Sequence, residues 1–140
     1  MSEVAIRTKI KDVLDTLKGD GQPLVDVFDE HKTGFPGYPC ATFEPARNRN
    51  EMASTSENER HYFFEIVIHQ EMEQVGRSEA IGILSSVFDS IVSELESDYS
   101  LGGTVHFCKA IEAEQGEYQE GAGWVIYKAI TLECVQLTTP

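Results

Sequence analysis

Apolar residues recur at helical spacing in two parts of the chain. Near the N-terminus they form one stripe, consisting of Ile6, Ile10, Val13, Leu14 and Leu17, and Gly19 follows as a typical helix stop. In residues 78–98 a second stripe consists of Ile81, Leu84, Val87, Phe88, Ile91 and Leu95. Ser78 has the side chain of an N-cap. The pattern predicts two amphipathic helices, each with one buried and one wet side.

Strict alternation marks the clearest strand, "RHYFFEIVIHQ", residues 60–70. Tyr62, Phe64, Ile66 and Ile68 share the face expected to be core, and the other face is mixed. Shorter stretches at 24–29 and 40–44 predict two more strands, with Pro45 ending the second. The segments 103–114 and 123–138 predict a closing pair of strands, joined by a longish hairpin loop at 115–123.

Residues 46–59 are polar and show no hydrophobic period. Loops longer than about 12–15 residues are uncommon in compact domains and are usually functional or disordered. We therefore interpret 46–59 as a long loop that contacts other protein subunits.

The predicted order is helix, strand, strand, strand, helix, strand, strand. Neighbouring strands joined by hairpins favour an antiparallel sheet, and two amphipathic helices can cover one of its faces. The fold class expected is therefore α+β, with residues 1–140 forming one domain.

Charge excludes several kinds of partner. The formal net charge is −13, and residues 61–140 hold 3 Lys/Arg against 13 Asp/Glu. Such a surface repels nucleic acid and membrane headgroups, so neither is expected as a tightly bound partner. No apolar run reaches the roughly 20 residues of a membrane span, and the charged N-terminus is not a secretory signal. The default location is the cytoplasm.

Catalytic and metal-binding patterns are not evident in the sequence. Cys40, Cys108 and Cys134 are an odd set without a close pair, expected to be buried and reduced. His61 and His69 share a strand face but stand about 26 Å apart, too far to share a metal. His106 and Cys108 alternate on one strand without any sign of an oxyanion hole. The cluster Asp26, Asp29, Glu30 and His31 is interpreted as a solvated strand end. We expect no enzyme activity, cofactor or metal.

Two charged groups each allow two interpretations. Arg47, Arg49 and Arg60 either keep the predicted loop soluble or dock it onto an acidic neighbour, possibly another copy of the chain. Glu112, Glu114, Glu117 and Glu120 form either an ordinary solvated face or a wall that must not bind a passing polyanion.

Three stretches carry a resemblance to a known family: "FPGYPCATFEPA", "RHYFFEIVIHQE" and "GWVIYKAITLECVQL". With the element order, they make the chain similar to the tail terminator and tail completion proteins of long-tailed bacteriophages, over most of its length.

The resemblance implies a non-enzymatic virion protein, assembled in the host cytoplasm. It implies a homo-oligomeric ring, often of six copies, that caps the tail tube and later joins head-tail connector proteins while DNA passes through. From the charge pattern, and not from the resemblance, we expect the three arginines at the subunit interface of such a ring and the four glutamates on its channel wall. A head-tail neck adaptor and a small ligand-binding α+β domain remain as alternatives. A convergent set of polar side chains in a pocket would favour the ligand-binding domain.

Overall fold

The computed structural model describes residues 3–52 and 58–138. Its elements follow the predicted order: α1 (Glu3–Asp15), β1 (Asp26–Phe28), β2 (Cys40–Met52), β3 (Asn58–Glu71), α2 (Arg77–Ser97), β4 (Phe107–Glu120) and β5 (Gly123–Thr138). The α+β class and the element order are confirmed. The five strands form one sheet in the order β1-β2-β3-β5-β4.

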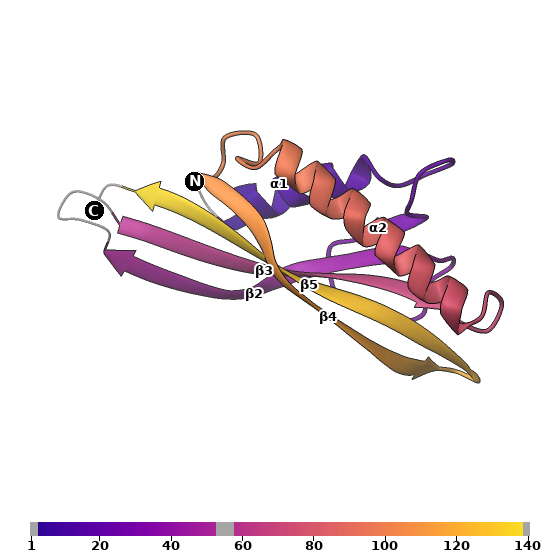
Figure 1. The fold of residues 1–140 in the computed structure, drawn as a ribbon. Helices are drawn as coiled ribbons and strands as arrows, with labels where there is room; N and C mark the ends of the chain where they lie inside the picture. Colours follow the sequence, from indigo (N-terminus) through magenta and orange to yellow (C-terminus); the bar gives the residue numbers. More distant parts are fainter. Residues whose placement is uncertain (1–2, 53–57, 139–140) are drawn as a thin grey trace.

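Helix positions agree with the hydrophobic stripes, except at one cap. Both helices lie on the same side of the sheet, and α2 crosses β3, β4 and β5 (Figure 1). One apolar core joins α1 residues such as Ile10, α2 residues such as Leu84 and the even-numbered side chains of β3. Ser78 is not the N-cap of α2, because the helix begins one residue earlier and Gly76 occupies the cap position.

The sequence predicts an entirely antiparallel sheet, but the observed sheet is mixed. β1 pairs with β2 in parallel, with Val27 opposite Ala41, whereas all other neighbours are antiparallel. The irregular chain from 29 to 39 returns to the start of β2, so the two strands run in the same direction. This crossover is not a hairpin, and the antiparallel prediction is wrong for β1.

The prediction of a long loop at 46–59 is also wrong for most of these residues. β2 continues to Met52 and pairs with β3 from Asn58 onward; residues 53–57 lie outside the described part of the chain. Pro45 does not end β2, since the register shifts between Pro45 and Arg47 and the bulge absorbs the irregularity. The stretch Ala46–Glu51 is exposed, so both of its faces are polar and no period marks it as a strand.

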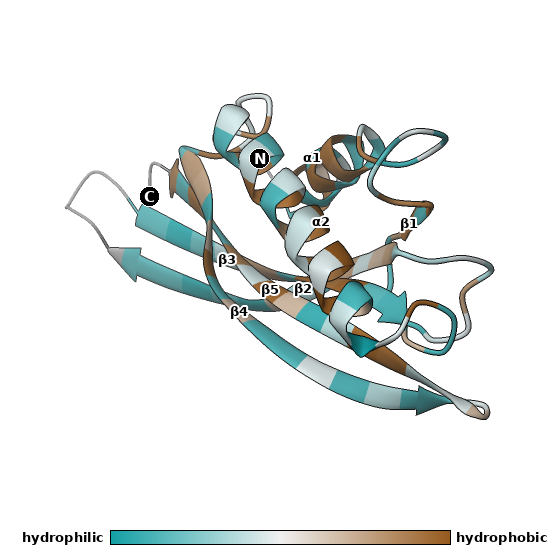
Figure 2. Cartoon of the chain, turned by 45° about the vertical axis from the view of Figure 1, so that its right-hand side comes forward, coloured by the Kyte–Doolittle hydropathy of each residue, from teal (hydrophilic) through white to brown (hydrophobic). Residues whose placement is uncertain are grey.

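The hairpin loop predicted at 115–123 is likewise mostly strand. β4 extends to Glu120, and only Gly121 and Ala122 separate it from β5. Gly121 has a φ of 60°, which suits a two-residue hairpin turn. Figure 2 shows β4 toward the β4–β5 turn, and at the other end of the sheet the end of β2 and the start of β3, as largely hydrophilic, whereas the helices carry many hydrophobic residues.

Candidate functional site

The side of the sheet opposite the helices carries many charged and hydrogen-bonding side chains. We call it the open face. The register places the odd-numbered side chains of β3 and β5 there, together with the β2 and β4 side chains that pair with them. Its acidic members are Glu44, Glu51, Glu59, Glu65, Glu71, Glu112, Glu114, Glu120 and Glu133.

The four glutamates predicted to act together are divided between the two faces. Glu112, Glu114 and Glu120 lie opposite Thr131, Ala129 and Gly123, on the open face. Glu117 lies opposite Ile126, whose side chain is in the core on the helix side, and it forms an ion pair with Arg77 of α2. Glu117 is therefore separated from the other three.

The three arginines are also divided. Arg47 and Arg49 lie on β2, where Arg47 stacks over the Phe63 ring at 4.3 Å and the Arg49 Nε is 3.1 Å from Glu51. Their partners across the strand, Phe63 and His61, are on the open face. Arg60 lies on the inner strand β3 and points to the other side, opposite Asn50 and Gln136.

A cavity of about 390 Å³ opens on the open face. It is bounded by the chain at 31–33 and by the strands of the sheet, and its lining includes His31, Thr42, Glu65, His69, Glu114, Tyr118 and Tyr127. A convergent set of polar side chains was not evident in the sequence, because these residues come from separate elements that only the fold brings together.

Hydrogen bonds connect the polar lining of this cavity into a chain. Tyr118 OH is 3.0 Å from His69 Nδ1, His69 Nε2 is 3.1 Å from Thr42 Oγ1, and Thr42 Oγ1 is 2.9 Å from His31 Nδ1. The His31 Nε2 lies 3.1 Å from a Glu65 carboxylate oxygen, within ion-pair distance but without hydrogen-bond geometry.

Burial, together with the nearby His31, lowers the pKa of His69 to about 4. Burial also raises the pKa of Tyr118. At neutral pH both groups are therefore uncharged. One consistent set of proton positions has Tyr118 donating to His69, His69 donating to Thr42, and Thr42 donating to His31.

His31 is a cavity residue, and its interpretation as part of a solvated strand end is wrong. Its backbone N–H donates to the Glu44 carboxylate, 3.0 Å away, which holds the crossing segment against β2. Thirteen residues separate these two partners, so only the parallel return of the chain brings them together.

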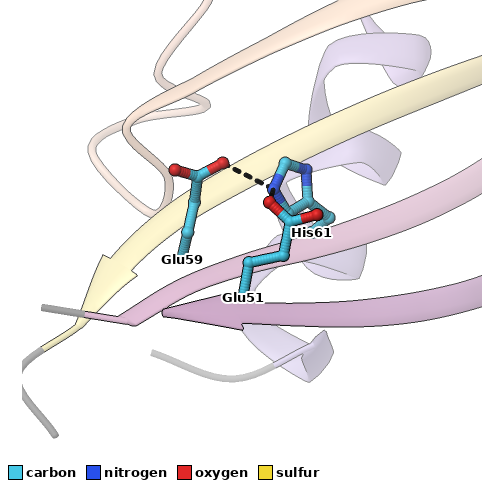
Figure 3. Close-up of side chains that lie close together, drawn as sticks. All are labelled: Glu51, Glu59 and His61. Carbon is cyan, nitrogen blue, oxygen red and sulfur yellow. Dashed lines mark hydrogen bonds and ion pairs between the residues drawn. The ribbon is translucent and has the colours of Figure 1, made fainter. Parts of the chain in front are cut away.

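A second polar cluster surrounds His61, near the described ends of β2 and β3. The His61 Nε2 is 2.6 Å from Glu59 and 3.8 Å from Glu51, and its Nδ1 is 2.9 Å from Glu133 of β5 (Figure 3 shows the first three residues). Only 6 % of the His61 surface is exposed. The ligand atoms of Glu51, Glu59 and His61 all lie within 4.8 Å of one another.

The cysteines are free and buried, as expected, but two of them do form a close pair. Cys108 of β4 lies directly opposite Cys134 of β5, and their side chains are hydrogen-bonded. Cys108 and Cys134 are 26 positions apart in the sequence, so only the strand register brings them together.

No protein-family model matches the chain, and no curated protein matches it significantly. Among the residues described, no helix is both long and apolar enough to cross a membrane.

Proposed function

We propose that this chain is a non-enzymatic assembly protein of a bacteriophage tail, forming a head-to-tail ring through which DNA passes. The observation that carries the proposal is that one sheet has two long unpaired edges. Within the described residues, β1 covers β2 only at Cys40–Thr42, which leaves Phe43–Met52 without an outer partner. β4 is the other edge strand, and its backbone pairs with β5 alone from Lys109 to Glu120.

Free edges of this length are templates for pairing with another chain. β2 and β4 run in opposite directions in the sheet, so β4 of a second copy could continue the sheet beside β2 as an antiparallel neighbour. A contact between two different surfaces of the same protein is heterologous, and it closes into a ring when the rotation permits.

Charges on these edges favour the same contact. Arg47 and Arg49 on β2 and Glu112 and Glu114 on β4 all belong to the open face. We call the contact between β2 of one copy and β4 of the next the joint. When the sheet continues across the joint, these opposite charges lie on the same side of it. Such complementarity sets the register of an interface and suppresses wrong partners. Arg60, on an inner strand, has no part in this contact.

In such a ring the open face would be directed toward the central channel and the helices outward. The glutamates of the open face would then form a wall that repels the DNA backbone. The proposed partners are further copies of the chain, six by resemblance, the tail tube protein and the head-tail connector proteins. Tail terminator and neck adaptor would share this architecture.

The test is the mass of the purified protein by light scattering, together with electron-microscope class averages. We expect ring particles from the wild type, and monomers from the Arg47→Glu, Arg49→Glu double variant. Arg60→Glu is the matched control, with the same charge change on an inner strand, and should assemble normally. A wild-type protein that stays monomeric at high concentration, or an Arg60→Glu variant that alone loses assembly, would contradict the proposed contact.

The cavity on the open face favours a second candidate, a small ligand-binding domain. Its lining combines two carboxylates, Glu65 and Glu114, with the rings of Tyr118 and Tyr127. Carboxylates and aromatic faces together favour a small organic cation. Saturable binding of a small organic cation by a monomeric protein would support the ligand-binding domain over the ring.

A further inference from the structure

We infer that Glu51, Glu59 and His61 form a binding site for one divalent first-row transition-metal ion, at the outer end of the β2–β3 hairpin. The site shares the β2 edge with the assembly proposed above, because Glu51 lies on β2 and Arg49 contacts it. All three ligands nevertheless come from a single chain, so metal binding does not require the ring. Three strands contribute: Glu51 comes from β2, Glu59 and His61 from β3, and the supporting Glu133 from β5.

The contacts of the His61 ring carry the inference. Both ring nitrogens face carboxylate oxygens, at 2.6 Å for Nε2 and Glu59 and at 2.9 Å for Nδ1 and Glu133. A neutral imidazole has one N–H, so it can donate to only one of them. The other nitrogen presents a lone pair to an anionic oxygen, and this contact requires a positive charge between them, either a second proton or a metal ion.

The position of Glu133 matches the support that a metal-bound histidine usually has. Such a histidine donates its other N–H to a carboxylate or carbonyl, which fixes the tautomer and aims the free nitrogen at the metal. Glu133, with a side chain only 15 % exposed, can accept from Nδ1. Nε2 is then directed at Glu59 and Glu51 (Figure 3). Glu133 is thus a positioning residue, not a ligand.

The two carboxylate ligands can adjust to an ion. Zinc binds nitrogen and oxygen donors at about 2.0–2.2 Å, which sets neighbouring donors roughly 3–4 Å apart. The His61 Nε2 is 3.8 Å from Glu51, which already suits a shared ion, but only 2.6 Å from Glu59. The Glu59 side chain would therefore have to rotate away to make room for the ion. The side chains of Glu51 and Glu59 are 51 % and 31 % exposed, which leaves them room to do so.

The local charge balance also favours a cation. Glu51, Glu59 and Glu133 gather around one imidazole, and Arg49 is the cation that contacts Glu51 and Glu133. One imidazole with two carboxylates is a donor set that suits zinc and its neighbours better than magnesium, which prefers an oxygen-only octahedral shell.

The experiment is a calorimetric titration of the full-length, chelator-treated protein with zinc chloride, and separately with magnesium chloride. We expect one zinc per chain, at least 10-fold weaker magnesium binding, and at least 10-fold weaker zinc binding in the Glu59→Gln and His61→Gln variants. Glu133→Gln, which keeps all three ligands, should also weaken zinc binding, since loss of a supporting partner costs about 10–100-fold in affinity.

Two matched controls exclude other sites. His106→Gln removes an exposed histidine, and Glu112→Gln removes an exposed carboxylate outside the cluster; both should bind zinc as the wild type does. Absorption of the cobalt(II)-loaded protein should show nitrogen and oxygen ligation without thiolate bands, which excludes the Cys108–Cys134 pair. Absence of zinc binding, or equal binding by the Glu59→Gln and wild-type proteins, would overturn the inference and leave a doubly protonated His61 as the explanation.

Discussion

Cys108 on β4 lies directly opposite Cys134 on β5, and the two thiols share a hydrogen bond inside the core. The bond from Cys134 lowers the pKa of Cys108, whereas the same bond, together with burial, raises the pKa of Cys134. Cys40 stands apart: burial raises its pKa to about 11. The three thiols therefore differ in chemistry although all three are buried.

This difference predicts the order in which iodoacetamide modifies the native protein. Thiolate is the reactive form, so Cys108 should be modified before Cys40, with Cys134 last. Peptide mass spectrometry over a time course measures the order. Cys134→Ala should slow modification of Cys108, because it removes the hydrogen-bond donor that stabilises the thiolate. Faster modification in that variant, or Cys40 reacting first, would show that access, not pKa, governs the rates.

Elements with one buried side could be predicted from the sequence. Ile6, Ile10 and Leu14 of α1, and Tyr62, Phe64 and Ile66 of β3, each repeat with the period of their element because one side faces the core. The prediction of strands failed where both faces of a strand are exposed to solvent. Arg47–Glu51 in β2 and Gln115–Glu120 in β4 are held by backbone pairing, and pairing leaves no hydrophobic period.

The polar clusters could not be predicted because they depend on register. The register confirms that His61 and His69 lie on one face of β3, as the sequence predicts. Their partners come from other strands: Glu133 for His61, and Thr42 and Tyr118 for His69. Only the pairing of β3 with β2 and β5, and the parallel return of the chain to β2, brings these residues together.

His69 predicts a loss of stability in mild acid. Its pKa is about 4 in the folded protein, against about 6.5 when unfolded. Above pH 6.5 the residue is neutral in both states and has no effect. Between 6.5 and 4 only the unfolded chain binds the proton, so the free energy of unfolding falls by roughly 1.4 kcal/mol per pH unit, reaching on the order of 2–3 kcal/mol.

The measurement is urea denaturation of the wild-type and His69→Gln proteins between pH 7.5 and 4.5. The variant should lose part of the pH dependence seen in the wild type. An NMR titration that follows the ring protons of His69 gives a direct check. A midpoint above pH 6 would mean that the ring is hydrated, contrary to its burial among Phe35, Thr42 and Tyr118.

The proposed edge contact predicts rescue by charge exchange. Arg47→Glu with Arg49→Glu should prevent assembly, and Glu112→Lys with Glu114→Lys should weaken it, because each pair brings like charges to the joint. Combining all four substitutions restores opposite charges, so light scattering should again show particles of wild-type mass. Glu117→Lys in place of the β4 pair is the control and should not rescue, since Glu117 faces α2. If the fourfold variant stays monomeric while folded, the two edges do not meet.

For the proposed ring, the division of the four glutamates predicts which of them would keep DNA from adhering to the channel wall. Glu112, Glu114 and Glu120 are on the open face, and Glu117 is paired with Arg77 on the other side. Each open-face charge is repeated in every copy of the ring. Three neutral substitutions per chain therefore remove a large part of the negative charge that would surround the channel. Replacing the three by glutamine introduces no like-charge contact at the joint, and backbone pairing between the edges should preserve the ring.

We expect rings of this triple variant to retain double-stranded DNA at low salt in a filter-binding assay, whereas wild-type rings release it. Salt shortens the distance over which the glutamates repel DNA, from about 30 Å at 0.01 M to about 10 Å at 0.1 M. The difference in DNA retention between the triple variant and the wild type should therefore shrink as salt is added. Glu117→Gln is the single-site control and should behave as the wild type, because its charge is already balanced by Arg77. Light scattering must first show equal particle mass for all three proteins. Equal DNA retention by the triple variant and the wild type would mean that the open face is directed away from the channel, with the helices lining it instead.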